Sequence, residues 1–72
     1  MDIEKRTKFL ELWDKYRHFL TTKQQQIFQM YLIEDMSYGE IGEFLNTTRN
    51  NAYESVKTSM NKLEEIDKKM RN

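Results

Sequence analysis

The segment from Thr48 to Lys57 has the residue types and spacing of a nucleic-acid contact surface. Arginine can bridge guanine O6 and N7, and asparagine can pair with adenine N6 and N7. Threonine, tyrosine and lysine can hold phosphates and fix the register of docking. We therefore expect DNA or RNA to be contacted by the outward residues Thr48, Arg49, Asn50, Asn51, Tyr53, Glu54 and Lys57. The alternative interpretation is an ordinary polar helix surface beside a structural turn.

Catalytic groups are few in this chain. His18 is the only histidine, and near a helix C-terminus its cation would be mildly favoured. The acidic pairs Glu34-Asp35 and Glu64-Glu65 are neighbours in sequence, and such neighbours point in different directions on a helix. Cysteine is absent, which excludes disulfides and thiolate metal sites. No glycine-rich phosphate loop is present. The sequence therefore predicts no enzyme, no metal site and no cofactor.

The length and composition predict one small all-helical domain covering residues 1–72. A chain of this size buries only about 60% of its unfolded surface, and small scaffolds often gain support from a partner. Charged residues make up 33% of the chain, which fits helices with solvated faces. Proline is absent and glycine occurs twice, so little in the composition interrupts helices.

The net charge is zero, whereas a simple nucleic-acid binder usually carries a basic surplus. The charge is unevenly distributed, however. Residues 25–45 contain four acidic and no basic side chains, whereas residues 46–63 contain Arg49, Lys57 and Lys62 against Glu54 alone. The proposed contact segment is therefore locally basic and follows an acidic one.

Two helices joined by a tight turn are predicted for residues 37–57. Ser37 and Glu40 have the spacing of a capping box, which opens a helix. We expect this third helix to cover about Tyr38 to Leu45, with an apolar face of Ile41, Phe44 and Leu45. This layout is a helix-turn-helix, whose second helix commonly enters the DNA major groove.

The turn between these helices has its own signals. Asn46 tolerates the left-handed conformation that ends a helix, and Thr48 can accept the first amide hydrogen bonds of the next helix. Gly42 would allow the two helices to approach closely. The inward positions are expected to be Ile41, Leu45, Ala52 and Val56.

Two helices are predicted before residue 37. The first covers roughly residues 2–19, and its aromatic stripe consists of Phe9, Trp13, Tyr16 and Leu20. The second begins with a capping box and runs to about Ile33. Thr21 with Gln24 and Thr22 with Gln25 both fit the spacing of that box, so both starts remain open.

The fourth helix is expected to run from near Thr48 almost to the end of the chain. A helix of about 20 residues is about 30 Å long, which is more than three short helices need to cover. The stretch from Leu63 to Met70 would then protrude and favour self-association or a partner helix. The predicted partner or dimer surface consists of Met60, Leu63, Ile66 and Met70.

A set of motif residues lies between residues 20 and 63, namely Leu20-Thr21, Lys23-Gln24, Tyr31, Ser37, Glu40-Ile41, Thr48-Arg49, Ala52-Tyr53 and Lys57. In this pattern the chain resembles region 4 of bacterial sigma factors and, more closely, the YlxM-like helix-turn-helix proteins. Asn46 and Thr47 replace the Gly-Val-like turn that is common in such motifs. The resemblance implies a small all-α bundle of the sigma-region-4-like or winged-helix-like DNA-binding type, with a long C-terminal helix.

The same resemblance implies a role in the signal-recognition-particle pathway of protein targeting. The implied partners are promoter DNA, the particle's RNA, the particle's GTPase or a second copy of the chain. Two alternatives are a dimeric protein-interaction module and a sigma-region-4-like transcription regulator with no role in targeting. No segment resembles a signal peptide or is long enough to span a bilayer, so a cytoplasmic protein is expected.

Overall fold

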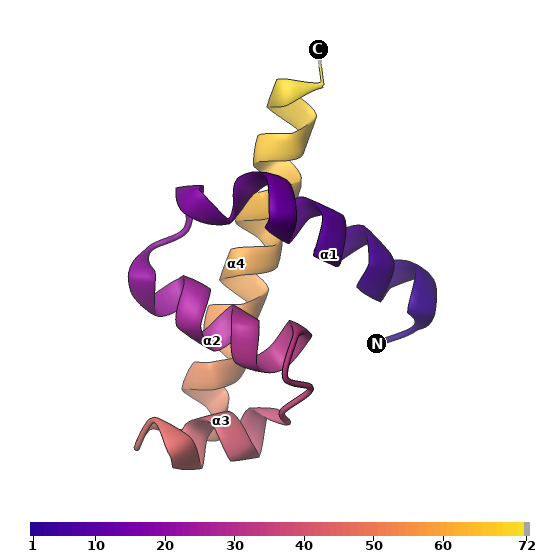
Figure 1. Ribbon diagram of the computed structural model, residues 1–72. Coiled ribbons are helices and arrows are strands. Elements are labelled where there is room, and N and C mark those ends of the chain that lie inside the picture. Colours follow the sequence, from indigo (N-terminus) through magenta and orange to yellow (C-terminus); the bar gives the residue numbers. More distant parts are fainter. Residues whose placement is uncertain (72) are drawn as a thin grey trace.

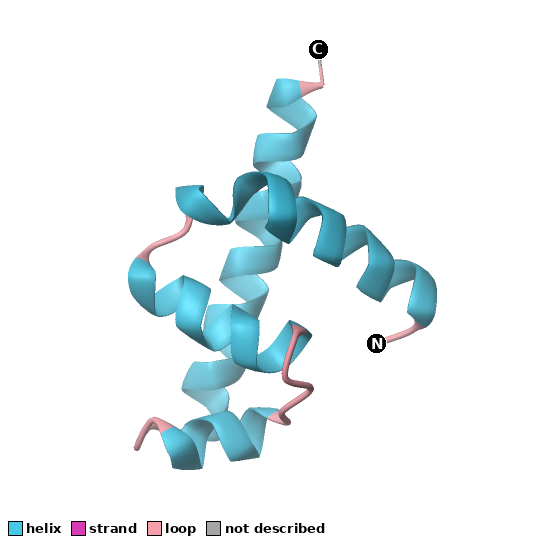
Figure 2. Cartoon of the chain, in the orientation of Figure 1, coloured by secondary structure: helices cyan, strands magenta, loops and turns pink. Residues whose placement is uncertain are grey.

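The computed structural model describes residues 1–71, which form helices and no strand (Figures 1 and 2). The elements are α1 (Ile3–Tyr16), the 3-10 helix η1 (Arg17–Phe19), α2 (Thr22–Leu32), α3 (Tyr38–Phe44) and α4 (Arg49–Met70). The predicted all-α class is confirmed. None of the helices in the described part of the chain is long and apolar enough to cross a membrane.

Helix α4 is the element on which the other three helices pack. It has 22 residues, which corresponds to about 33 Å, and it contacts α1, α2 and α3. Figure 1 shows α3 beside the start of α4, α2 across its middle and α1 across its C-terminal half. The molecule is accordingly elongated, with extents of 40 × 25 × 16 Å.

The core lies where α1 and α2 meet α4 and is rich in aromatic residues. The Phe28 ring lies 6.3 Å from Phe9 in an edge-on arrangement and 5.8 Å from Trp13. Aromatic pairs at such distances add about 0.5–1.5 kcal/mol beyond the area they bury. Of the stripe predicted for the first helix, Phe9, Trp13 and Leu20 are buried and Tyr16 is half-buried.

One helix boundary differs from the prediction, and one open alternative is decided. Helix α1 ends at Tyr16 rather than near residue 19, because the chain tightens into η1 and the Leu20 amide donates to the Arg17 carbonyl at 3.0 Å. Tight turns of this kind are frequent at helix ends. Thr21 is the cap of α2: its hydroxyl accepts from the Gln24 amide at 3.1 Å, and its own amide donates to the Gln24 side chain at 3.0 Å.

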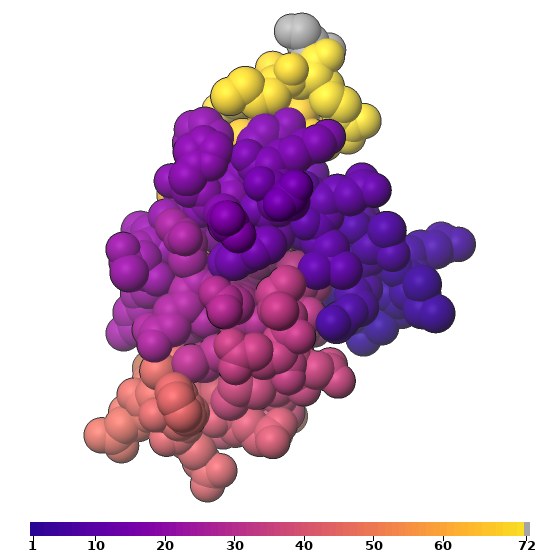
Figure 3. Space-filling view, in the orientation of Figure 1, coloured from indigo at the N-terminus to yellow at the C-terminus, as the bar shows by residue number. Residues whose placement is uncertain are grey.

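The distal half of α4 is covered more fully than the sequence predicts. Leu63 is fully buried against the rest of the chain. Lys8 of α1 forms an ion pair of 2.7 Å with Glu64, and the Tyr16 hydroxyl donates to Asp67 at 3.2 Å. The placement of Leu63 on a partner surface is therefore wrong, because α1 crosses α4 at this level. Protrusion is limited to the last turns, where the Met70 side chain is 59% exposed (Figure 3).

A buried hydroxyl on α4 leads to a stability prediction. Ser59 is fully buried, and its Oγ has no hydrogen-bond partner among residues 1–71. A buried polar group without a partner costs about 1–3 kcal/mol. We expect Ser59→Ala to raise the free energy of unfolding by about 1 kcal/mol, measured by urea denaturation. Ser55→Ala is the control, because Ser55 lies one turn earlier and is only half-buried. A clear loss of stability in Ser59→Ala would contradict the expectation.

Candidate nucleic-acid interface

A capping box fixes the start of α3. The Ser37 hydroxyl accepts from the Glu40 amide at 3.1 Å, and the Ser37 amide donates to the Glu40 carboxylate at 2.8 Å. The hydrogen bond from the Ser37 amide holds the pKa of the Glu40 carboxyl below its usual value. The prediction from the spacing of these two residues is confirmed.

The turn between α3 and α4 has the predicted chemistry. Asn46 adopts a left-handed φ of 54°, and the Thr47 amide donates to the Gly42 carbonyl at 2.8 Å. The Thr48 hydroxyl accepts from the Asn51 amide at 3.0 Å and caps α4. A Cβ atom on Gly42 would lie only 3.0 Å from the Thr48 carbonyl carbon. The close approach of the two helices therefore depends on this glycine, as predicted.

Four of the seven predicted contact residues lie on one exposed side of α4. Successive residues turn by about 100° around a helix axis, so Arg49, Tyr53 and Lys57 fall within a sector of about 80°. Asn50 lies beside this sector at about 100° from Arg49. All four side chains are exposed. We call Arg49, Asn50, Tyr53 and Lys57 the contact face.

The other three predicted residues have different surroundings. Asn51 lies on the opposite side of the helix, where its side-chain amide donates to the Thr47 hydroxyl at 3.0 Å. Thr48 acts as the helix cap. Glu54 is exposed at the border of the contact face. These three residues fit a role in shaping or bordering the surface rather than at its centre.

A cluster of three tyrosines adjoins the contact face. The rings of Tyr31 and Tyr38 are stacked, with 5.0 Å between centroids and an angle of 5°. The rings of Tyr38 and Tyr53 are 5.3 Å apart and nearly perpendicular, at 87°. Burial raises the pKa of the Tyr38 hydroxyl, and the neighbouring Tyr31 adds to the shift. The sequence gives no signal for this cluster, because its members come from α2, α3 and α4.

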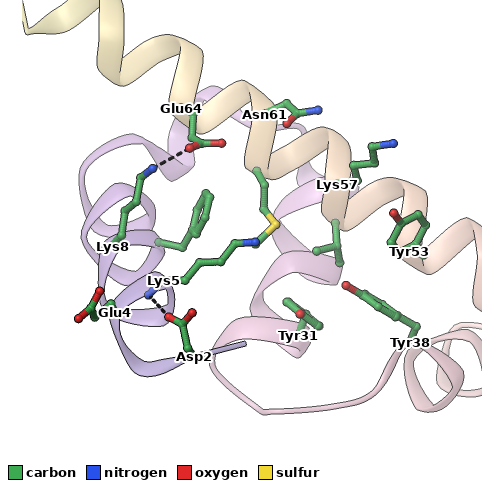
Figure 4. A pocket seen from close by; sticks show the side chains of 13 residues that line it. Asp2, Glu4, Lys5, Lys8, Tyr31, Tyr38, Tyr53, Lys57, Asn61 and Glu64 are labelled. Carbon is green, nitrogen blue, oxygen red and sulfur yellow. Dashed lines mark hydrogen bonds and ion pairs between the residues drawn. The ribbon is translucent and has the colours of Figure 1, made fainter.

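Several hollows adjoin the tyrosine cluster, and two of them are lined by Tyr53. An open groove of about 730 Å³ runs between α1 and α4 and is lined by residues that include Tyr31, Tyr38 and Tyr53 (Figure 4). A second hollow of about 440 Å³, which we call the cationic notch, is lined by Tyr38, Arg49, Asn50 and Tyr53. Lys57 adjoins the notch, since its Nζ lies 6.0 Å from the centroid of the Tyr53 ring.

The contact face and the tyrosine cluster together have the residue types that bind a polyanion with planar groups. Arg49 and Lys57 supply positive charge, Asn50 supplies an amide, and Tyr53 supplies an exposed ring. Within residues 1–71, no three histidine, aspartate or glutamate side chains are grouped closely enough to hold a metal ion.

Comparison with known proteins identifies similar sequences. A family described as "Putative helix-turn-helix protein, YlxM / p13 like" matches residues 3–71. A UPF0122 protein of Thermoanaerobacter sp. (strain X514) is 41% identical over 59 residues, which are 82% of this chain and 50% of the relative. A UPF0122 protein of Bacillus velezensis is 34% identical over 70 residues, which are 97% of this chain and 64% of the relative.

A UPF0122 protein of Oceanobacillus iheyensis is 35% identical over 68 residues, which are 94% of this chain and 65% of the relative. The chain thus spans between half and two-thirds of the length of the curated relatives it matches. No solved structure matches the chain.

Proposed function

The chain belongs to the UPF0122 (YlxM / p13 like) family. We propose that it is a regulatory or accessory helix-turn-helix protein that binds nucleic acid through the start of α4. One observation carries the proposal. The second helix of the motif presents Arg49, Tyr53 and Lys57 together on one exposed side. In a helix-turn-helix this is the helix whose first residues reach the bases.

The chemistry of the contact face divides into two tasks. Arg49 and Asn50 are the residues that read base edges, because their planar groups can form paired hydrogen bonds with guanine and adenine. Lys57 and the Tyr53 hydroxyl hold phosphates and set the register. Since the net charge of the chain is zero, binding relies on these few cations, and its affinity falls with added salt in proportion to the few phosphates that they contact.

Replacing Arg49 tests this proposal. Arg49→Ala should weaken binding by about 1–3 kcal/mol, because one base-reading or phosphate-holding cation is lost. The measurement is fluorescence anisotropy with a labelled DNA duplex and with a labelled RNA hairpin, at several salt concentrations. Lys69→Ala is the matched control, since it removes one exposed charge from the opposite end of the same helix. If the wild-type chain binds neither probe at low salt, the proposal fails.

The family resemblance supports a second, finer proposal, namely that the nucleic acid or its partner belongs to the signal-recognition-particle pathway. This proposal rests on analogy with the YlxM-like proteins rather than on the geometry of the site. A pull-down from a bacterial lysate, with and without nuclease, tests it. Recovery of the particle's RNA, or of the particle's GTPase after nuclease treatment, would support the pathway. Recovery of neither would contradict it and leave a transcriptional role as the alternative.

A further inference from the structure

The tyrosine cluster offers a ring surface that base-edge and phosphate contacts do not use. Tyr53 is 41% exposed, although it packs against Tyr38. Tyr31 covers one face of Tyr38 by stacking on it. The cluster is therefore anchored from within and partly open at the Tyr53 ring, over which the Lys57 Nζ lies 6.0 Å from the centroid. An anchored, partly exposed aromatic ring is the feature on which single-stranded nucleic acids stack their bases.

The charged side chains differ between the two ends of the groove beside the tyrosine cluster. Three carboxylates line the end of the groove near α1: Glu4 of α1, Asp2, which accepts from the Lys5 amide at 2.7 Å, and Glu64 of α4, which is paired with Lys8 of α1 (Figure 4). Asp2 and Glu64 are engaged within the chain, and Lys5 and Lys8 line this end of the groove as well. The cationic notch, in contrast, is lined by Tyr38, Arg49, Asn50 and Tyr53, with no carboxylate among them. A polyanion would therefore be drawn to the notch end of the groove.

We propose that the cationic notch accepts one unpaired base of a looped or single-stranded nucleic acid, an inference that rests on the proposed function and specifies the class of its ligand. The base stacks on the ring of Tyr53 and stands nearly perpendicular to Tyr38, because those two rings meet at 87°. The guanidinium of Arg49 and the amide of Asn50 face the base edge, and Lys57 holds a flanking phosphate.

The shape of the site favours an unpaired base over an intact duplex. Bases within a duplex are stacked on their neighbours, so a side chain reaches their edges but not their faces. A base in a bulge or loop exposes a face, and stacking on an aromatic side chain is worth about 5- to 150-fold in affinity per base. The notch, of about 440 Å³, presents one exposed aromatic ring, that of Tyr53. One base rather than a run of bases is therefore expected.

The experiment compares three RNA hairpins with the unmodified chain. The first has one bulged adenine in its stem, the second has an abasic residue at the bulge, and the third is fully paired. The abasic hairpin keeps the flexible backbone and removes only the ring. We expect the bulged hairpin to bind about 5- to 150-fold more tightly than the abasic hairpin. The same three hairpins in DNA distinguish RNA from single-stranded DNA as the source of the base.

Single substitutions test whether Tyr53 is the residue on which the unpaired base stacks. Tyr53→Ala should abolish the preference for the bulged over the abasic hairpin, and Tyr53→Phe should retain it, because phenylalanine keeps the ring. Phe19→Ala is the matched control: Phe19 is 40% exposed but lies on η1, outside the groove and the notch. Circular dichroism checks that each variant is folded. The binding of the three hairpins to the wild-type chain tests the inference even if a variant does not fold.

The binding results distinguish a failure of this inference from a failure of the proposed function. Equal binding of bulged, abasic and paired hairpins would overturn the inference and leave nucleic-acid binding intact. A preference for the bulge that survives in Tyr53→Ala would also overturn it, since the base would then lie elsewhere. Failure of every hairpin and duplex to bind at low salt would refute the proposed function and, with it, the inference.

Discussion

Leu63→Ala is expected to lower the free energy of unfolding by about 2–5 kcal/mol. Leu63 is fully buried between α4 and the helices that cover it, so the change removes three carbon atoms from the core and leaves a cavity. For a chain of 72 residues, whose total stability is on the order of 5 kcal/mol, this loss approaches complete unfolding at room temperature. The measurement is urea denaturation followed by circular dichroism.

Met70→Ala is the matched control on the same apolar stripe. Its side chain is 59% exposed, and surface substitutions usually change stability by less than about 0.5 kcal/mol. A similar small effect in both variants would contradict the packing described for Leu63. Sedimentation of the wild-type chain at high concentration tests the remaining partner surface of Met60, Ile66 and Met70. A monomer at every concentration would exclude self-association through it.

Gly42→Val is expected to lower the free energy of unfolding by about 3 kcal/mol, at the upper end of what overpacking costs. A Cβ atom at this position would lie 3.0 Å from the Thr48 carbonyl carbon and 3.1 Å from both the Arg49 nitrogen and the Thr47 oxygen. These are backbone atoms of the turn and of the start of α4, so they cannot rotate away as a side chain can. Thermal or urea denaturation measures the effect.

Gly39→Ala is the control that separates crowding from glycine's flexibility. The nearest atom to a Cβ at Gly39 is the Ser37 hydroxyl oxygen, at 3.9 Å, so alanine fits without displacement. We expect this change to stabilise the chain by up to about 1 kcal/mol, because alanine loses less backbone freedom in a helix. If Gly42→Val and Gly39→Ala both lower the free energy of unfolding, the cause is a general sensitivity of α3 to substitution. The close contact between α3 and α4 at Gly42 would then not explain the effect.

The effect of Gly42→Val extends to the proposed function. Moving the turn displaces Arg49 relative to Tyr38, and these residues line the cationic notch together. The variant should therefore lose nucleic-acid affinity even under conditions where it remains folded. Gly39→Ala should bind like the wild-type chain.

Helix starts and turns were predictable from the sequence because short-range hydrogen bonds fix them. Ser37 and Glu40 form their capping box, Asn46 adopts the left-handed conformation, and Thr48 caps α4. Each of these interactions joins residues no more than four positions apart, so the local sequence contains both partners. The apolar spacing likewise predicted that Ile41, Ala52 and Val56 would be buried. Of the same predicted faces, Leu45 is only half-buried and Phe44 is 69% exposed, because α3 ends at Phe44.

Contacts between distant segments were not predictable in the same way. The hydrogen bond from Tyr16 to Asp67 joins residues 51 positions apart. Leu63 would belong to an apolar stripe in either case, whether it packs in the core or against a partner. The apolar spacing therefore predicts that Leu63 is buried, but it does not predict which segment buries it.

The sequence by itself determined the helices, their caps and the position of the contact face, because these depend on periodicity and on hydrogen bonds between near neighbours. Only the tertiary structure decided that α1 covers Leu63 and that Tyr31, Tyr38 and Tyr53 meet beside Arg49. The physical reason is that packing between helices depends on their crossing positions. Those positions are set by the whole core, and no segment of the chain encodes them alone.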